Sequence, residues 1–306
     1  MKPELPDAVI AIASVPPTGW RVWWTAARPR TLPLAASPVL VGIALAWAEG
    51  TAPRWLTALA TLLAALLIQI GTNLHNDAAD HERGNDGADR LGPLRVTAAG
   101  WASAAAVRHA AHLAFVAAFA LGIHLAIVGG WPIVAIGLAS LAAGYAYSGG
   151  PRPISYSPFG ELFVLVFFGL VAVGGSHYLQ SGAPTLRALF AGLAVGMPAA
   201  AVLLVNNLRD RGADLAAGRR TLAAVLGPAA SRRLHAALML LPFGLLPFFA
   251  PRPAAWLALA ALPATVAVIH RCRRAEGVAF NGVLADTARA QLIFGFLFAI
   301  GSLLPP

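Results

Sequence analysis

RWLTALATLLAALLIQIGTNLHNDAAD, residues 54–80, is a long apolar run that ends in asparagine and aspartate. A second stretch, LRALFAGLAVGMPAAAVLLVNNLRDRGAD at residues 186–214, follows the same pattern. The chain has only 13 Asp and Glu among 306 residues, and seven lie in or beside these two motifs: Asp77, Asp80, Glu82, Asp86, Asp89, Asp210 and Asp214. Crowding carboxylates at the end of an apolar run is costly, so we expect these acids to have a function.

The composition is that of a membrane protein. Hydrophobic residues make up 58% of the chain, charged residues only 11%, and the mean hydropathy is +0.70. A soluble domain carries about 25% charged residues. Nine apolar runs approach the length needed to cross a bilayer as helices: 31–49, 54–76, 104–128, 131–149, 159–181, 186–208, 232–250, 253–271 and 287–304. We therefore expect an all-α polytopic membrane protein with nine transmembrane helices around a central cavity.

The distribution of basic residues predicts the orientation. With the N-terminus in the cytoplasm, 19 of the 22 Lys and Arg fall on the cytoplasmic side, and only Arg54, Arg187 and Arg252 on the other. Cytoplasmic loops of membrane proteins carry such an excess. We expect a multi-pass protein of the inner (cytoplasmic) membrane with its active site facing the cytoplasm.

The chain divides into a short lead and one large domain. We expect residues 1–24, which hold four prolines, to form a flexible cytoplasmic lead, and residues 25–306 to form a single transmembrane domain. The net charge of +9 is attributed to basic loops that contact membrane lipid, so no nucleic-acid partner is expected. Cys272 is the single cysteine, which excludes an intrachain disulfide.

The two acidic motifs form a faint internal repeat. Asn73-x-x-x-Asp77 and Asn206-x-x-x-Asp210 lie 133 residues apart, each near the end of a helix that runs toward the cytoplasm. A pseudo-twofold bundle would bring them face to face across the cavity. Residues three or four apart share one face of a helix, so Asp80 joins the first group and Asp214 the second.

Two converging groups of oxygen ligands suit magnesium and a diphosphate. Mg²⁺ binds one or two carboxylates and completes its shell with substrate phosphates, so we expect two ions, one on each motif. Neighbouring arginines can bind phosphate bidentately; the candidates are Arg83, Arg90, Arg95, Arg209, Arg219 and Arg220. If the organic part of the diphosphate is allylic, its departure leaves a cation that a dry apolar cavity protects and aromatic rings stabilise.

Several further segments carry a family resemblance. They are Ala27–Pro33, Asn73–Asp80, Asp89–Arg95, Tyr147–Ile154, Gly160–Phe163, Tyr178–Gln180, Asn206–Asp210, and Asp214 followed by Gly218–Leu222. In this order they resemble the UbiA superfamily of intramembrane prenyltransferases, and within it the branch that prenylates 1,4-dihydroxy-2-naphthoate in menaquinone biosynthesis. The resemblance implies Mg²⁺-dependent transfer of a polyprenyl group from polyprenyl diphosphate to that aromatic quinone precursor, with decarboxylation, giving demethylmenaquinone.

The resemblance also implies roles for individual residues. The implied metal ligands are Asn73, Asp77, Asp80, Asp86, Asp210 and Asp214, of which Asp77, Asp80, Asp210 and Asp214 would be catalytic. The implied substrate-binding residues are Asn73, Asn206, Arg30, Arg83, Arg90, Arg95, Arg219, Arg220, Tyr147 and Tyr156. For Arg28 and Arg30 a role in topology and lipid contact is an alternative, and the two tyrosines could instead anchor the helices at the membrane interface.

Other functions remain open at this point. The acceptor could be 4-hydroxybenzoate, homogentisate, a chlorophyll precursor or haem B. A cation-coupled transporter is a rival of another class, but its ion sites would lie near the bilayer midplane, whereas these acids lie at helix ends. A purely structural membrane protein leaves the paired motifs unexplained.

Overall fold

The computed structural model describes residues 17–85, 91–249 and 254–304, so predictions for Asp86, Arg90 and the first sixteen residues lie outside the described residues. The longer helices are α2 (Trp20–Ala27), α3 (Leu32–Ala48), α4 (Trp55–Glu82), α5 (Ala104–Gly129), α6 (Trp131–Ala146), α7 (Gly160–Leu165), α8 (Ala172–Ser181), α9 (Leu186–Ala216), α10 (Leu222–Gly244), α11 (Ala254–Ala258), α12 (Leu262–Arg274) and α13 (Phe280–Leu303). The short segments are η1 (Pro29–Thr31), η2 (Ile154–Tyr156), η3 (Val166–Val171), η4 (Leu246–Phe249), η5 (Leu259–Ala261) and η6 (Gly277–Ala279).

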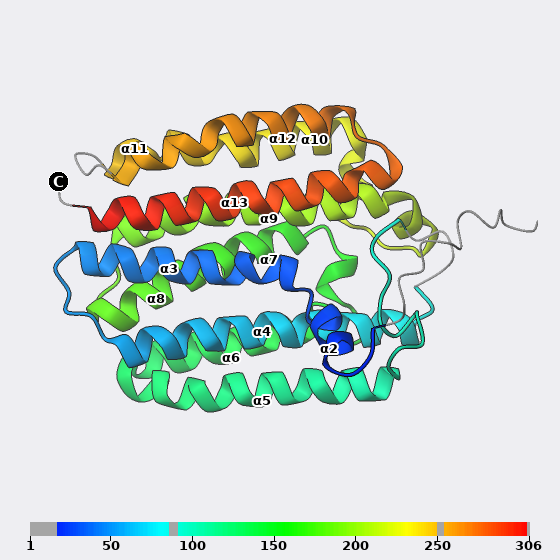
Figure 1. The fold of residues 1–306 in the computed structure, drawn as a ribbon, viewed down its shortest axis with the longest axis horizontal. Helices are drawn as coiled ribbons and strands as arrows, with labels where there is room; N and C mark the ends of the chain where they lie inside the picture. Colours follow the sequence, from blue (N-terminus) through cyan, green and yellow to red (C-terminus); the bar gives the residue numbers. More distant parts are fainter. Residues whose placement is uncertain (1–16, 86–90, 250–253, 305–306) are drawn as a thin grey trace, which may run out of the picture.

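Within the described residues these elements form nine helical rods that lie side by side along the long axis of the molecule (Figure 1). η3 joins α7 to α8, and η5 joins α11 to α12, so each of these groups makes one rod. Six of the rods are long and apolar enough to cross a membrane, and α6 is a shorter apolar helix. The predicted all-α membrane fold is confirmed.

Several helices extend further than hydropathy predicted. α4 continues to Glu82 and α9 to Ala216, while α10 already begins at Leu222. Residues 209–231, which lie between two of the predicted apolar runs, are therefore mostly helical, and only five residues separate α9 from α10. Hydropathy predicts that a membrane helix ends where polar residues begin. Here the polar residues of the motifs continue the helix and make its backbone hydrogen bonds. Both acidic motifs are thus on rigid helix.

Small residues let the fifth rod approach α9 closely. A Cβ atom placed on Gly169 would lie 2.4 Å from the Gly192 carbonyl oxygen, and one on Gly196 would lie 2.8 Å from the Leu165 carbonyl oxygen. Gly169 lies in η3, a π-helical segment. Such contacts between small residues are a typical way for helices to pack in membranes. The contact fixes α7 and its phenylalanines beside the motif-bearing helix α9.

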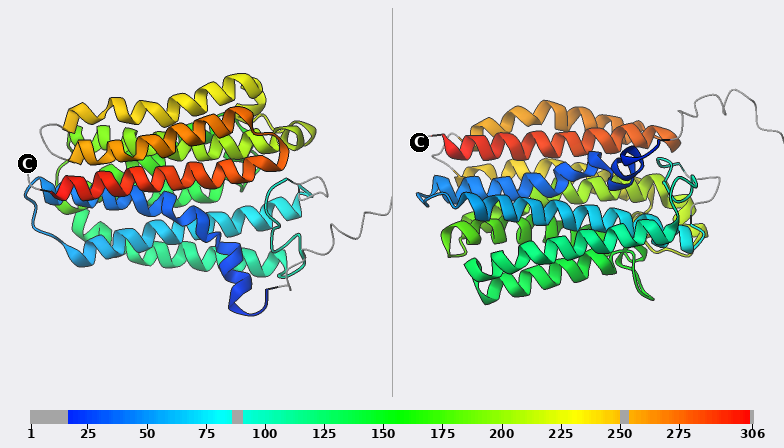
Figure 2. Two further views of the ribbon diagram at one scale, coloured as in Figure 1. Left: turned by 45° about the horizontal axis from the view of Figure 1, so that its top comes forward. Right: turned by 60° about the horizontal axis from the view of Figure 1, so that its bottom comes forward.

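The N-terminal lead is more ordered than predicted. Trp20–Ala27 forms α2, and it buries Val22 and Ala26 in a cluster with Leu74 and Ala78 of α4. Figure 2 shows this short helix set across the end of the neighbouring rods. Residues 20–24 are thus helical, and the helix presents one apolar face to the bundle and leaves its tryptophans exposed.

The close approach at Gly169 predicts the effect of an added methyl group. Gly169→Ala should destabilise the protein by about 1–3 kcal/mol, because overpacking forces the helices apart. Gly174→Ala is the matched control, since its added Cβ meets nothing within 4 Å and alanine favours helix. Thermal unfolding in detergent measures both; equal melting temperatures for the two variants would contradict the predicted packing.

Candidate functional site

A cavity of about 1370 Å³ runs between the rods. Its walls are apolar over most of their length, with Leu34, Val39, Leu125, Ile133, Phe163, Phe167, Leu179 and Leu203 among the lining residues. One end is polar and is lined by Arg28, Asn73, Asn76, Asp80, Arg95, Asn206, Asn207, Asp210, Asp214 and Arg219. This volume exceeds the usual 300–1,000 Å³ of small-molecule sites, and the walls suit a long hydrocarbon chain.

Asp80 of α4 is the most heavily paired acid at the polar end. Its Oδ2 lies 2.6 Å from Nη1 of Arg95, and its Oδ1 lies 2.8 Å from Nη2 of Arg219. Asn85 also donates to Oδ1 at 3.1 Å. Asp80 is only 3% exposed, and a buried carboxylate requires such partners to remain charged.

The acids of α9 lie on the other side of the same cavity. Asp214 Oδ1 is 3.6 Å from Nη1 of Arg219, and Asp214 Oδ2 accepts a hydrogen bond of 3.4 Å from the Thr221 hydroxyl. Arg209 holds Asp210 with two bonds, of 2.7 and 2.6 Å. Arg219 thus bridges Asp80 of the first motif and Asp214 of the second. The two motifs face each other, as the repeat predicted.

The environment of Arg219 keeps it charged. Burial alone lowers the pKa of this guanidinium, but Asp80, Tyr156 and Asp214 outweigh that effect and raise the pKa above its ordinary value. Its guanidinium also lies 4.3 Å from the centre of the Tyr156 ring. The polar end therefore combines fixed positive charge with carboxylates, which is the combination that a metal-bound diphosphate needs.

Asp77 does not line the cavity, in contrast to the prediction. Its carboxylate accepts a bond from the backbone N–H of Val96 at 3.3 Å and another from the Thr97 hydroxyl. Asn76 lines the cavity instead, and its side-chain oxygen accepts from Arg95 at 3.0 Å. One residue along a helix is a rotation of 100°, so Asn76 and Asp77 cannot face the same way. The predicted metal ligation by Asp77 does not fit this orientation.

The sequence contained a signal for Asn76 that the prediction missed. Asn76-x-x-x-Asp80 repeats the spacing of Asn206-x-x-x-Asp210 as well as Asn73-x-x-x-Asp77 does. All four residues of the 76/80 and 206/210 pairs line the cavity. The pairing of the two motifs is therefore shifted by three residues from the one predicted.

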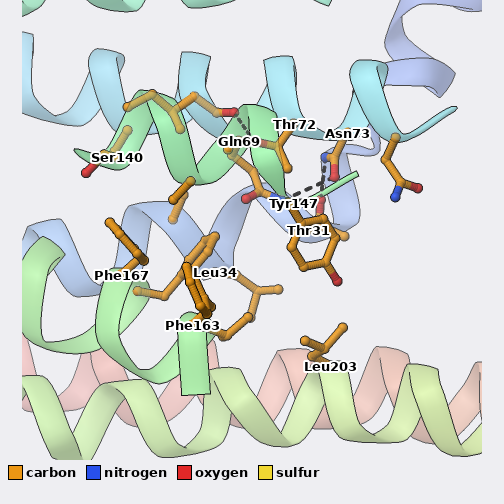
Figure 3. A pocket seen from close by; sticks show the side chains of 18 of the residues that line it. Thr31, Leu34, Gln69, Thr72, Asn73, Ser140, Tyr147, Phe163, Phe167 and Leu203 are labelled. Carbon is orange, nitrogen blue, oxygen red and sulfur yellow. Dashed lines mark hydrogen bonds between the residues drawn. The ribbon is translucent and has the colours of Figure 1, made fainter. Parts of the chain in front are cut away.

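Asn73 lines the cavity but is also bonded to the start of α3 (Figure 3). Its amide donates to the Ala27 carbonyl at 3.0 Å and to the Thr31 hydroxyl at 2.9 Å, and its oxygen accepts from Gln69. Figure 3 places Tyr147 beside this group, with its ring over the cavity toward Leu203. Asn73 therefore joins the α2–α3 junction to α4.

The predicted substrate-binding residues separate into two sets. Asn73, Asn206, Arg95, Arg219 and Tyr147 line the cavity. Arg30, Arg83, Arg220 and Tyr156 are not among the lining residues. Arg30 and Arg220 are exposed and lie outside the lining of the cavity, so their contact with substrate stays a prediction.

Arg83 and Tyr156 instead support the site from behind. Arg83 donates to the carbonyls of Ser148 and Gly150, at 2.5 and 3.1 Å, and so holds the turn that follows Tyr147. The Tyr156 hydroxyl accepts from Asn85 at 2.6 Å. Neither residue lines the cavity; both contact residues that do, or the loops beside them. Sequence spacing does not reveal such supporting positions.

Arg28 is a lining residue that the prediction passed over in favour of Arg30. It has φ 53° and is the one residue other than glycine with positive φ among the described residues. Left-handed backbone is uncommon for such a residue and is often found at functional sites. The signal was Pro29, since the residue before a proline is kept out of the helical region.

Comparison with known proteins shows the family to which this chain belongs. Residues 35–278 match the UbiA prenyltransferase family. The chain is 33% identical to the 1,4-dihydroxy-2-naphthoate octaprenyltransferase of Haemophilus influenzae, covering 93% of this chain and 96% of that protein. It is 36% identical to the enzyme of the same name from Mycobacterium tuberculosis, covering 90% and 95%.

A solved structure has the same fold. The UbiA homolog from Archaeoglobus fulgidus, bound to DMAPP and Mg²⁺, superposes with a TM-score of 0.67 at 16% identity, over 92% of this chain and 98% of that one. The sequence match covers most of the chain, and the cavity has its two acidic motifs at one end. This multi-pass membrane protein belongs to the UbiA prenyltransferase family and is a prenyltransferase.

Proposed function

We propose that this enzyme transfers a polyprenyl group from polyprenyl diphosphate to 1,4-dihydroxy-2-naphthoate, with loss of carbon dioxide, to give the hydroquinone form of demethylmenaquinone. The proposal rests on one observation: Asp80 and Asp214 face each other, with Arg219 between them, at the polar end, or mouth, of a long apolar cavity. The acceptor is inferred from relatives that carry this activity in their names and align over nearly their whole length.

The residues at the polar mouth fit magnesium. In the part of the chain that the structure describes, no three His, Cys, Asp or Glu side chains converge closely enough to hold a metal ion alone. Magnesium instead prefers one or two carboxylates together with substrate phosphates and water. We assign Asp80 with Asn76 to one ion, and Asp210 and Asp214 with Asn206 to a second.

Bound magnesium would neutralise the diphosphate and make it a better leaving group. Arg95 and Arg219, which pair with Asp80 in the structure, lie where they can contact the phosphate oxygens. The carbon–oxygen bond to the diphosphate breaks, and its electron pair leaves with the diphosphate. Fixed positive charge around the developing anion stabilises this step.

The apolar walls of the cavity surround the allylic cation that this cleavage leaves. Tyr147 and Phe163 both line the cavity and present rings to it (Figure 3), so they can stabilise an allylic cation. The naphthoate ring supplies the electron pair for the new carbon–carbon bond. The carboxylate leaves as carbon dioxide, and its bonding pair restores the aromatic ring. Exclusion of water protects the cation until this bond forms.

The positive-charge distribution supports a cytoplasmic location for the polar mouth. A soluble naphthoate acceptor would enter from that side. The prenyl chain would lie along the apolar part of the cavity, toward the opposite end of the bundle.

The different orientations of Asp77 and Asp80 predict different mutant phenotypes. Asp80→Asn should lower turnover by about 10²–10³-fold and raise the Mg²⁺ concentration needed for half-maximal activity. Asp77→Asn should lower turnover by only about 10–100-fold, because it releases the Val96–Thr97 turn and thereby loosens Arg95. Its magnesium requirement should stay unchanged.

Turnover assays across a magnesium titration measure both effects. A magnesium requirement for Asp77→Asn that rises as much as that of Asp80→Asn would show that Asp77 is a ligand. Circular dichroism of the purified variants controls for loss of fold.

The acceptor is tested directly by product analysis. Membranes containing the protein should convert labelled polyprenyl diphosphate and 1,4-dihydroxy-2-naphthoate to the prenylated naphthohydroquinone, or the quinone that air oxidation makes from it, only when Mg²⁺ is present. The parallel reaction with 4-hydroxybenzoate should give no product. Product from 4-hydroxybenzoate alone would keep the prenyl transfer and overturn the acceptor.

A further inference from the structure

A second hollow, of about 530 Å³, lies between α10 and α12, away from the cavity described above. We name it the basic groove; it is lined by Ala229, Arg232, Arg233 and Ala236 of α10 and by Arg273 of α12. The four α10 residues are spaced i, i+3, i+4 and i+7 and so share one helix face. The two alanines leave the space that the three arginines surround.

The arginines of the basic groove carry charge that the described residues do not neutralise. No ion pair or hydrogen bond to another described residue involves the side chains of Arg233 and Arg273, and both are exposed. Nearby Arg271 and Arg289 differ, because both pair with Asp286. The groove is therefore a site of concentrated positive charge.

Arg232 is held in place at the bottom of this groove. Its Nη2 donates to the Ala275 carbonyl at 2.8 Å, and its guanidinium lies 5.9 Å from the centre of the Phe280 ring. Its Nε is buried and has no hydrogen-bond partner in the described part of the chain. A positioned guanidinium at the groove is suited to a phosphate oxygen.

The surface next to the groove is apolar along the direction of the helices. Leu240 and Leu241 are 43% and 55% exposed and lie two turns beyond Arg233 on the same face of α10. Val266 is 40% exposed and lies two turns before Arg273 on α12. α10 and α12 run side by side (Figure 1). A molecule that binds here would contact the arginines at one end and exposed apolar side chains further along the two helices.

We propose that the basic groove binds an anionic phospholipid, with its headgroup phosphate on the three arginines and its acyl chains along α10 and α12. Basic pockets between membrane helices take up such headgroups. The groove lies at the same end of the bundle as the polar mouth of the cavity, since α12 ends and α10 begins there. Bound lipid would join α10 to α12 without contacting the prenyl-transfer site.

The test uses the full chain and a double variant, Arg233→Gln/Arg273→Gln. The control is Arg152→Gln/Arg274→Gln, which removes the same charge from exposed arginines outside the groove. Purified proteins in neutral detergent are titrated with phosphatidylglycerol or phosphatidylcholine. Melting temperature and native mass spectrometry report binding.

Phosphatidylglycerol, but not phosphatidylcholine, should raise the melting temperature of the wild type and the control. The groove variant should bind it about thirtyfold more weakly, because each of the two arginines near a membrane surface contributes about fivefold. Equal retention of phosphatidylglycerol by the groove variant and the control would overturn the proposal. Equal protection by inorganic phosphate alone at millimolar concentration would overturn it in favour of a free-phosphate site.

A second variant tests the site without changing charge. Ala236→Leu should fill the groove and lower phosphatidylglycerol binding while all three arginines remain. Its melting temperature without added lipid controls for folding. Undiminished lipid binding by this variant would place the lipid elsewhere and overturn the proposal.

Discussion

The contact of Arg219 with Asp80 on one side and Asp214 on the other is the constraint on which the site depends. It joins α4 to the segment after α9, across a gap that would otherwise hold facing carboxylates. Removing one partner of a buried ion pair costs about 3–5 kcal/mol, so this arrangement requires all of its members. It also requires both motifs to be rigid, and α4 and α9 meet that need by remaining helical to Glu82 and Ala216.

Residues outside the lining of the cavity hold the side chains of the site in position. Asp77 holds the Val96–Thr97 turn and thereby places Arg95 against Asp80. Arg83 holds the turn after Tyr147. The contact between Gly169 and Gly192 sets the distance between the fifth rod and α9. The charged side chains therefore lie at one end of the cavity, and the rest of its wall is apolar. Chemistry through an allylic cation requires this separation of charged and apolar surfaces.

Much of this could be predicted from the sequence, and the failures have physical causes. Apolar runs identified all nine rods, and the acidic residues located Asp80, Asp210 and Asp214 at one site. Hydropathy placed the helix ends too early, because it treats buried polar residues as loop. The sequence did not reveal that Asn76, and not Asp77, faces the cavity, because two spacings of four residues overlap in the first motif. The supporting roles of Arg83 and Tyr156 depend on contacts between loops distant in sequence.

We propose that each motif holds one metal ion against a shared diphosphate. This proposal is tested most directly by an electron paramagnetic resonance titration with Mn²⁺, in the presence of a prenyl diphosphate analogue that cannot be cleaved. We expect two bound ions per chain, one of which is lost in Asp80→Asn and the other in Asp214→Asn. Two ions in either variant, or a single ion in the unmodified protein, would contradict it.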